Sequence, residues 1–284
     1  MKNKLKFSII TPCLNADKYI HETLISVINN SAVTDAIVDL EYIVCDGQSS
    51  DGTIEIIENV FSKNYPNNIS LQLFSEKDDG LYDALCKGLK HVTGDICAYI
   101  NAGDLYSPQA FEIVNKLFCE KSIQWLTGIS TIYNENGHIV SFQVPFKYRT
   151  HLIQRGFYGQ RLPFIQQEST FWDKELNKTI DLDRLKQFKY AGDYYLWKQF
   201  STKAQLQIVE AWLSGFRRHS GQLSNTHIDE YYKEMDSISD QSKFKDHFQA
   251  FADKLLWLFL PNHFKKRFNN KAFYRYDHDI QQYI

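Results

Sequence analysis

The alternation of short apolar runs with helix-like segments constrains the fold more than any other feature of the sequence. Apolar runs of strand length occur at residues 6–11, 40–45, 69–75 and 96–100. Segments of helical periodicity follow at 19–30, 53–61 and 81–91, and another begins at Ser107-Pro108. This order predicts βαβ units, and so an α/β fold with a mostly parallel, Rossmann-like sheet flanked by helices.

The second half of the chain has a looser pattern. Segments 125–133 and 138–144 flank Asn136-Gly137, a pair that suits a hairpin turn. A helix is expected at 192–201, a strand at 205–209, and charged helices from about 225. Because no repeat or low-complexity linker interrupts the chain, we predict one domain over residues 1–222. Residues 223–284 form a helical C-terminal extension in this scheme.

Composition excludes several classes of function. The 32 basic residues nearly balance the 34 acidic ones, whereas a duplex-binding protein has a basic excess, so no nucleic-acid partner is expected. Five cysteines without a CxxC spacing exclude a zinc ribbon and favour a reducing cytoplasm. We expect no signal peptide, because the apolar run near residue 7 is too short, and no run of about 18–20 apolar residues occurs. We therefore expect a cytoplasmic protein, at most peripheral at the inner face of the membrane.

The chemistry is expected at the carboxyl ends of the strands, where open parallel sheets bind ligands. Residues 11–15, 46–53, 75–80 and 101–104 follow the four expected strands and are rich in acids and turn residues. Each turn alone is ordinary. Together, clustered carboxylates repel one another unless a cation or hydrogen-bond donors offset them. Neither GxGxxG nor GxxxxGK[ST] follows the first strand, which excludes those two phosphate-binding loops.

Six motifs resemble one known family in order and spacing. They are FSIITPCLNADKYIHETLISV, EYIVCDGQSSDGT, SEKDDGLYDALCKGL, TGDICAYINAGD, QQESTFW and AGDYYLW. Together they resemble the family 2 glycosyltransferases of GT-A fold, inverting enzymes that use nucleotide sugars to build polysaccharides and glycolipids. The resemblance is dense over residues 5–120. It implies a nucleotide-sugar-binding half at 1–120 and an acceptor-binding half at 121–222.

The resemblance also implies which residues hold the substrates. The first strand end packs on the nucleobase and the acid of the second bonds the base or ribose, which here means Thr11, Pro12, Leu14, Asn15 and Asp46. The third and fourth strand ends border the donor pocket with Glu76, Asp78, Gly80, Tyr82, Asp83, Asn101, Ala102 and Gly103. Gln167 and Glu168 lie near the donor and acceptor sugars in this reading, or simply end an edge strand.

A divalent cation, Mg²⁺ or Mn²⁺, is the implied cofactor, because it stabilises the leaving diphosphate. Asp104 matches the metal-binding acid of the family. Many members carry another Asp where this chain has Gly103, so the affinity and identity of the metal stay open. His219 matches a late metal ligand of some relatives, although a lone histidine is more often structural.

Asp193, in AGDYYLW, matches the general base that takes the proton of the acceptor hydroxyl. It opens an expected helix, whose dipole would favour the charged carboxylate. A plain helix-capping Asp is the alternative.

The predicted activity is transfer of a sugar from a UDP-linked donor to a saccharide or lipid-linked acceptor. A sugar nucleotidyltransferase and a catalytically silent nucleotide-sugar-binding subunit remain alternatives. In the tail, the apolar run 255–260 precedes basic residues up to Arg275, with no acid between Lys254 and Asp277. This pattern suits either peripheral membrane contact or a terminal helix docked on the domain.

Overall fold

The computed structural model describes residues 4–218, 227–269 and 272–284. His219, the expected second metal ligand, lies outside these residues.

The central sheet has eight strands in the order β12-β10-β6-β9-β4-β1-β2-β3. Its first part is parallel and comprises β1 (Lys6–Cys13), β2 (Asp39–Asp46), β3 (Ile69–Ser75) and β4 (Ile96–Tyr99). Next to β4, β9 (Thr170–Asp173) runs antiparallel to both β4 and β6 (Trp125–Thr127). Two further parallel strands complete the sheet, β10 (Gln207–Val209) and β12 (Phe273–Tyr274). The predicted α/β fold with a mostly parallel sheet is confirmed.

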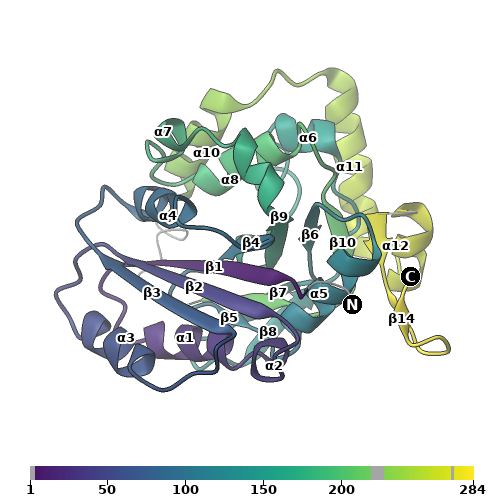
Figure 1. The fold of residues 1–284 in the computed structure, drawn as a ribbon. Helices are drawn as coiled ribbons and strands as arrows, with labels where there is room; N and C mark the ends of the chain where they lie inside the picture. Colours follow the sequence, from purple (N-terminus) through teal and green to yellow (C-terminus); the bar gives the residue numbers. More distant parts are fainter. Residues whose placement is uncertain (1–3, 219–226, 270–271) are drawn as a thin grey trace.

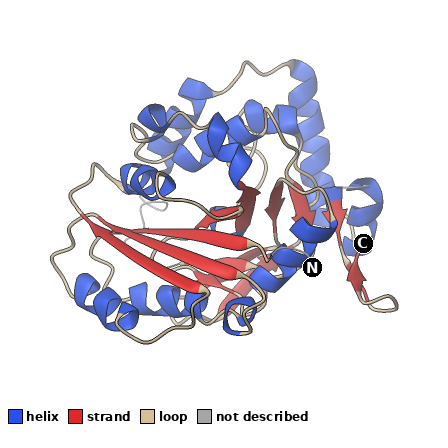
Figure 2. Cartoon of the chain, in the orientation of Figure 1, coloured by secondary structure: helices blue, strands red, loops and turns tan. Residues whose placement is uncertain are grey.

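Helices cover both faces of this sheet (Figures 1 and 2). One face carries α4 (Leu81–Leu89), α6 (Thr150–Gln154), α7 (Leu182–Leu185) and α8 (Gly192–Phe200). The other carries α1 (Ile20–Ile28), α2 (Ser31–Thr34), α3 (Thr53–Phe61) and α5 (Ala110–Glu120). Two 3₁₀ turns flank β9, namely η1 (Gln167–Ser169) and η2 (Lys174–Thr179).

The segment 125–133, expected as one strand, is divided between two sheets. β6 ends at Thr127, and β7 (Ser130–Tyr133) belongs to a smaller sheet in the order β5-β11-β7-β8. The other members of this sheet are β5 (Leu105–Tyr106), β8 (Ile139–Gln143) and β11 (Ser214–Arg217). Gly128 lies at the break, where a Cβ would stand 2.8 Å from the carbonyl oxygen of Ala211. The hairpin at Asn136-Gly137 is confirmed, since β7 and β8 pair antiparallel.

Residues 227–269 and 272–284 are packed into the domain. They contain α10 (Ile228–Ile238), α11 (Phe244–Phe259) and α12 (Asn262–Asn269), then β12 and a hairpin of β13 (Tyr276–Asp277) and β14 (Gln282–Tyr283). The predicted helices are present, but β12 was not predicted and pairs with β10 in the central sheet. Among the described residues, no helix is long and apolar enough to cross a membrane.

An aromatic cluster fixes the position of α8 against the sheet. Trp197 stacks on Trp125 of β6 with 5.6 Å between ring centroids, and Phe200 lies 5.4 Å from Trp172 of β9. These rings are all buried. Burying such large apolar surfaces stabilises the packing of the helix, and so places the residues of its first turn.

Candidate active site

Hydrogen bonds connect the carboxyl ends of β2 and its neighbouring strands. We call this edge of the sheet the strand-end rim. Asp46 lies opposite Cys13 of β1 and Ser75 of β3. Its carboxylate, 2% exposed, accepts hydrogen bonds from the N–H and hydroxyl of Ser49 and from the hydroxyl of Ser75. The thiol of Cys13 also donates to Oδ1, at 3.8 Å, so four hydrogen bonds fill the roughly four lone pairs that a carboxylate offers. A nucleoside contact by Asp46 would therefore displace one of these donors.

The expected nucleobase residues differ in their exposure. Thr11 is fully buried and its hydroxyl lies 3.0 Å from the Tyr42 hydroxyl, so its side chain belongs to the core, as does Pro12 within β1. Leu14, in contrast, is 55% exposed. Asn15 has a positive φ of 49° and accepts a hydrogen bond from the backbone N–H of Ser50 at 2.9 Å. Of the expected nucleobase residues, Leu14 is therefore the one with an exposed apolar side chain that can pack on a nucleobase.

The third strand end turns into α4 at Gly80. Its φ of 125° favours glycine, and its N–H donates to Asp78 at 3.0 Å. Burial raises the pKa of Asp78. Glu76 and Asp83 lie 3.4 and 3.7 Å from the ammonium of Lys87, which offsets their charges.

Tyr82 connects this loop to the motif that carries Asp193. The Tyr82 hydroxyl donates to the carbonyl oxygen of Tyr190 at 2.9 Å and lies 3.5 Å from Oδ1 of Asp193. Gly192 makes this approach possible, because a Cβ at residue 192 would stand 2.5 Å from the Tyr82 ring. Two motifs about 110 residues apart thus meet at one point.

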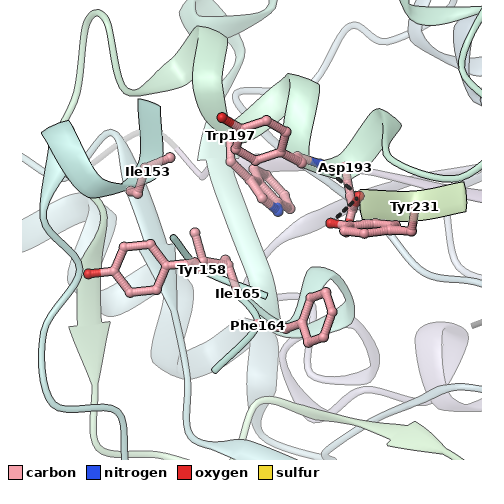
Figure 3. Close-up of a pocket in the computed structure, with 8 residues that line it drawn as sticks. Ile153, Tyr158, Phe164, Ile165, Asp193, Trp197 and Tyr231 are labelled. Carbon is pink, nitrogen blue, oxygen red and sulfur yellow. Dashed lines mark hydrogen bonds between the residues drawn. The ribbon is translucent and has the colours of Figure 1, made fainter. Parts of the chain in front are cut away.

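Asp193 lies in the first turn of α8 beside a small aromatic pocket. The pocket is lined by Asp193, Ile153, Tyr158, Phe164, Ile165, Tyr194, Trp197 and Tyr231 (Figure 3). Its free space is ≈10 Å³, which is about the room of one water molecule. Such a pocket admits a hydroxyl group beside the carboxylate but not a whole sugar ring.

Burial raises the pKa of Asp193 to about 6. The N–H of Tyr194, at 2.7 Å, and the hydroxyl of Tyr231, at 3.1 Å, both donate to Oδ1 and oppose this rise, because they favour the charged form. The sequence had suggested that the helix start would keep this group ionised. The hydrogen bond from the N–H of Tyr194 does lower the pKa of Asp193, but the desolvation of the buried carboxylate raises it by more.

The sequence predicted a helix in this region but did not indicate that α10 completes the surroundings of Asp193. Tyr231 of α10 supplies the hydroxyl described above. The carboxylate of Glu234, one turn later, accepts hydrogen bonds from the backbone N–H groups of Lys189, Tyr190 and Ala191 at 3.0, 2.9 and 2.8 Å. It thereby satisfies three consecutive backbone donors of the segment that leads into α8. Nothing in the spacing of IDEYYKEMDSI indicates these long-range contacts.

Asp104 is more deeply buried than Asp193, and its carboxylate contacts the backbone of β11. Its carboxylate is 3% exposed, and Oδ1 accepts the backbone N–H of Arg217 at 2.8 Å. Glu168 is also buried, and its Oε1 has no hydrogen-bond partner. Burial raises the pKa of both acids, and the charges of Asp104 and Asp193 raise that of Glu168 further. Glu168 therefore lies within electrostatic reach of both.

Gln167 fixes the loop that carries Glu168. It accepts a hydrogen bond from Asn101 at 3.1 Å and donates to the carbonyl oxygen of Tyr99 at the end of β4. The fourth strand end also includes Ala102 and Gly103, the latter with a φ of 115°. These contacts place the Gln167-Glu168 motif beside the Asn101–Asp104 turn. The pocket of Asp193 is not lined by Asp104.

The surroundings of Asp104 fit a divalent cation that shares its ligands with a substrate. Two buried carboxylates supply hard oxygens, and the unpartnered Oε1 of Glu168 is an oxygen that a cation could take. Among residues 4–218, 227–269 and 272–284, no group of three or more His, Cys, Asp or Glu is placed to hold a metal. A cation here would complete its shell with phosphate and water oxygens.

The sequence profile of glycosyl transferase family 2 matches residues 8–177. The chain belongs to this family. It is 23% identical to the UDP-Glc:alpha-D-GlcNAc-diphosphoundecaprenol beta-1,3-glucosyltransferase WfgD of Escherichia coli, over 82% of this chain and 85% of that protein. It is also 32% identical to the minor teichoic acid biosynthesis protein GgaB of Bacillus subtilis, over 40% of this chain and 12% of that protein.

Alignments with larger synthases cover less than half of this chain. The chain is 26% identical to the chondroitin synthase of Pasteurella multocida over 47% of its own length, and it spans 13% of the length of that protein. With GgaB, where the share is 12%, these relatives are several times longer than this chain.

Solved structures share the GT-A fold. Staphylococcus aureus TarS 1–349 has a TM-score of 0.59 at 16% identity, covering 92% of this chain and 74% of that one. The mannosyltransferase PcManGT of Pyrobaculum calidifontis, in complex with GDP-Man and Mn²⁺, has a TM-score of 0.56 at 16% identity, covering 91% and 71%. At these identities the likeness establishes the fold.

Proposed function

We propose that this chain is an inverting glycosyltransferase that moves a sugar from a UDP-linked donor to a saccharide or lipid-linked acceptor in polysaccharide biosynthesis. The observation that carries the proposal is the carboxylate of Asp193, beside a small aromatic pocket and with a pKa raised to about 6. A general base works best when its pKa lies near the working pH. Family membership supports the reaction class.

In the proposed step, Asp193 accepts the proton of an acceptor hydroxyl. The oxygen attacks the anomeric carbon from the side opposite the nucleotide, and the bond from that carbon to the diphosphate oxygen breaks. The nucleoside diphosphate leaves with the bonding electron pair, and the anomeric configuration inverts. Tyr231 and Tyr82 orient the carboxylate for this transfer, through the contacts at 3.1 and 3.5 Å.

The donor is proposed to lie along the strand-end rim. Leu14 would face the base, while Asp46 and Asn15 would bond the nucleoside. Asp78, Gly80 and the turn at Asn101–Gly103 would border the diphosphate and sugar. Support for a UDP donor comes from WfgD, whose name specifies UDP-Glc, and from the structure of TarS 1–349 in complex with UDP-GlcNAc, which has a TM-score of 0.57.

A bound Mg²⁺ or Mn²⁺ would neutralise the charge that develops on the leaving diphosphate. Asp104 and Glu168 would hold it in our proposal, together with His219. The PcManGT structure, solved with Mn²⁺, supports a divalent cation. The division into a donor half at 1–120 and an acceptor half at 121–222 is proposed with one extension, because Tyr231 of α10 bonds Asp193.

A catalytically silent nucleotide-sugar-binding subunit is the second candidate. It is favoured by Gly103 and by the burial of Asp104, whose Oδ1 is already bonded to Arg217. A thermal-shift screen of nucleotide sugars identifies the donor, because a true ligand raises the unfolding temperature by mass action. The release of free sugar from that donor then separates the two candidates. An enzyme releases sugar slowly, and a silent subunit releases none.

A further inference from the structure

The outer face of α11 is a continuous apolar surface. We define the phenylalanine stripe as its six exposed residues, Phe244, Phe248, Phe251, Leu255, Leu258 and Phe259. Phe244 is 91% exposed and Phe248 is 71% exposed. Exposed apolar residues that occur singly are normal, but a contiguous set of this kind marks a contact surface. In Figure 1, α11 lies at the outer edge of the molecule.

The stripe follows the geometry of one helix face. At about 100° per residue, its six members fall within about 100° of the helix circumference. The opposite face carries the buried residues of α11, Asp246, Ala250, Asp253 and Trp257. This helix therefore turns its acids inward and its phenylalanines outward, the reverse of an ordinary surface helix.

The charges of the segment are segregated in the same way. Asp246 and Asp253 are the only acids between Asp240 and Asp277, and both are buried. Arg155 pairs with Asp246 at 2.7 Å, and Arg149 pairs with Asp253 at 2.6 Å. The exposed charges of α11, its N-cap and α12 are therefore positive, and they are carried by Lys243, Lys245, Lys254 and Arg267.

Two neighbouring features extend this surface. On α12, Phe264 and Phe268 are exposed one turn apart, next to Arg267. Beside the first turns of α11, a hollow is lined by His151, Arg155, Lys245 and Gln249. Cationic side chains around a hollow at the border of an apolar stripe match the phosphate groups of a lipid surface.

We propose that the phenylalanine stripe and its basic border dock this protein on an anionic phospholipid surface. Phenylalanines enter the boundary between headgroups and acyl chains, and lysines at the border attract anionic lipid. No residue of the phenylalanine stripe takes part in the proposed sugar transfer, so this proposal goes beyond the proposed function. It would place the enzyme where a lipid-linked acceptor resides.

A second copy of the chain is a poorer occupant. The spacing 244, 248, 251, 255, 258 matches the seam of a coiled coil, so such a pair deserves a test. The positions that flank this seam are Lys245, His247, Ala252, Lys254 and Phe259. None is acidic, so two copies would set lysines beside each other with no carboxylate to pair them.

The structure also decides which residues can be tested. In the tail, Trp257 is 1% exposed, and the buried Lys265 donates to the carbonyl oxygens of Val144 and Trp257 at 2.7 and 3.2 Å. Arg275 pairs with Glu210 at 3.2 Å. Truncation after Lys254 would therefore remove core residues, and point substitutions on the exposed face are needed.

The test is flotation of the full chain with vesicles of phosphatidylcholine, with or without one third phosphatidylglycerol, in the absence of donor and acceptor. We expect binding to the anionic vesicles only, weakening as salt rises. The double variant Phe248→Gln/Phe251→Gln should lose binding by about tenfold or more. Lys245→Glu/Lys254→Glu should lose it by a similar factor. Phe142→Gln is the matched control, because Phe142 is 68% exposed on β8 of the smaller sheet.

Failure of the wild type to float with anionic vesicles at low salt would overturn the proposal, and so would equal loss in the Phe142→Gln control. Sedimentation velocity supplies the remaining outcome. A wild-type dimer that the Phe248→Gln/Phe251→Gln variant converts to monomer would show that a second copy covers the stripe. Because no sugar is transferred in these measurements, they leave the proposed enzymatic activity to its own tests.

Discussion

The hydroxyl of Tyr231 donates a hydrogen bond of 3.1 Å to Oδ1 of Asp193. This contact joins α10 to the first turn of α8 and brings a residue from beyond position 222 to the proposed base. With Tyr82 of α4, it gives Asp193 a tyrosine on each of two other helices. The electrostatics of the base therefore depend on three distant parts of the chain.

The first prediction concerns pH. Since Asp193 must be ionised to accept a proton and its pKa is raised to about 6, kcat should fall as the pH drops below about 6. Tyr231→Phe removes a donor that favours the ionised form, so the acid limb should move to higher pH. Tyr232→Phe, the neighbouring tyrosine, whose hydroxyl donates to Gly159, should leave the limb in place. Profiles of kcat against pH decide this, and an acid limb near 4 in the wild type would count against it.

The second prediction concerns Gly192→Ala. A Cβ at this residue would stand 2.5 Å from the ring of Tyr82, which is buried and has little room to move. Overpacking of this kind costs about 1–3 kcal/mol, which exceeds the gain of about 1 kcal/mol or less from the helix propensity of alanine.

Urea unfolding measures this loss of stability. Gly52→Ala is the control, because a Cβ there makes only an ordinary contact with Asp17 at 3.7 Å. We expect its effect to stay below about 1 kcal/mol. Equal stability of Gly192→Ala and the wild type would contradict the close packing of Tyr82 on α8.

The third prediction concerns Glu234→Gln. The carboxylate accepts three backbone N–H groups just before α8. Loss of its charge weakens these bonds, so the variant should lose about 1–3 kcal/mol of stability. Glu230→Gln on the same helix, where the carboxylate lies 3.8 Å from His227 at the surface, should cost less than about 0.5 kcal/mol. Thermal unfolding of both variants compares them, and similar melting temperatures would exclude a role for Glu234 in fixing α8.

The fold and the strand ends could be predicted from the sequence, because short runs of neighbouring residues determine where strands end and helices begin. Strand ends such as Asp46 and helix starts such as Asp193 follow from short runs of residues. Sequence reasoning missed Tyr231 and Glu234, since their partners lie 38 to 45 residues away and no periodicity marks them. It also missed the break at Gly128, where a close tertiary approach overrides the apolar run.

The fourth prediction concerns the cation. Asp104→Asn retains an oxygen for the N–H of Arg217 but removes a buried ionisable group whose charge raises the pKa of Glu168. In the absence of metal the variant should be at least as stable as the wild type, while Mn²⁺-dependent binding of UDP should weaken by about tenfold or more. Calorimetry with Mn²⁺ and with EDTA measures this.

The control for the metal experiment is Asp183→Asn, an exposed acid of α7 paired with Lys186. It should bind UDP as the wild type does in both conditions. If the wild type binds UDP equally well with Mn²⁺ and with EDTA, the proposed cation has no part in holding the nucleotide.

The central claim is that Asp193 is the base, and Asp193→Asn tests it most directly. The amide keeps the shape of the side chain but cannot accept the proton, so the rate of sugar transfer should fall by about 10²-fold or more. Donor affinity, measured by calorimetry on the same sample, should stay within about twofold of the wild type. The substitution changes the proton acceptor and not the contacts that bind the donor in its ground state. Transfer at the wild-type rate by a folded, donor-binding Asp193→Asn protein would contradict the account.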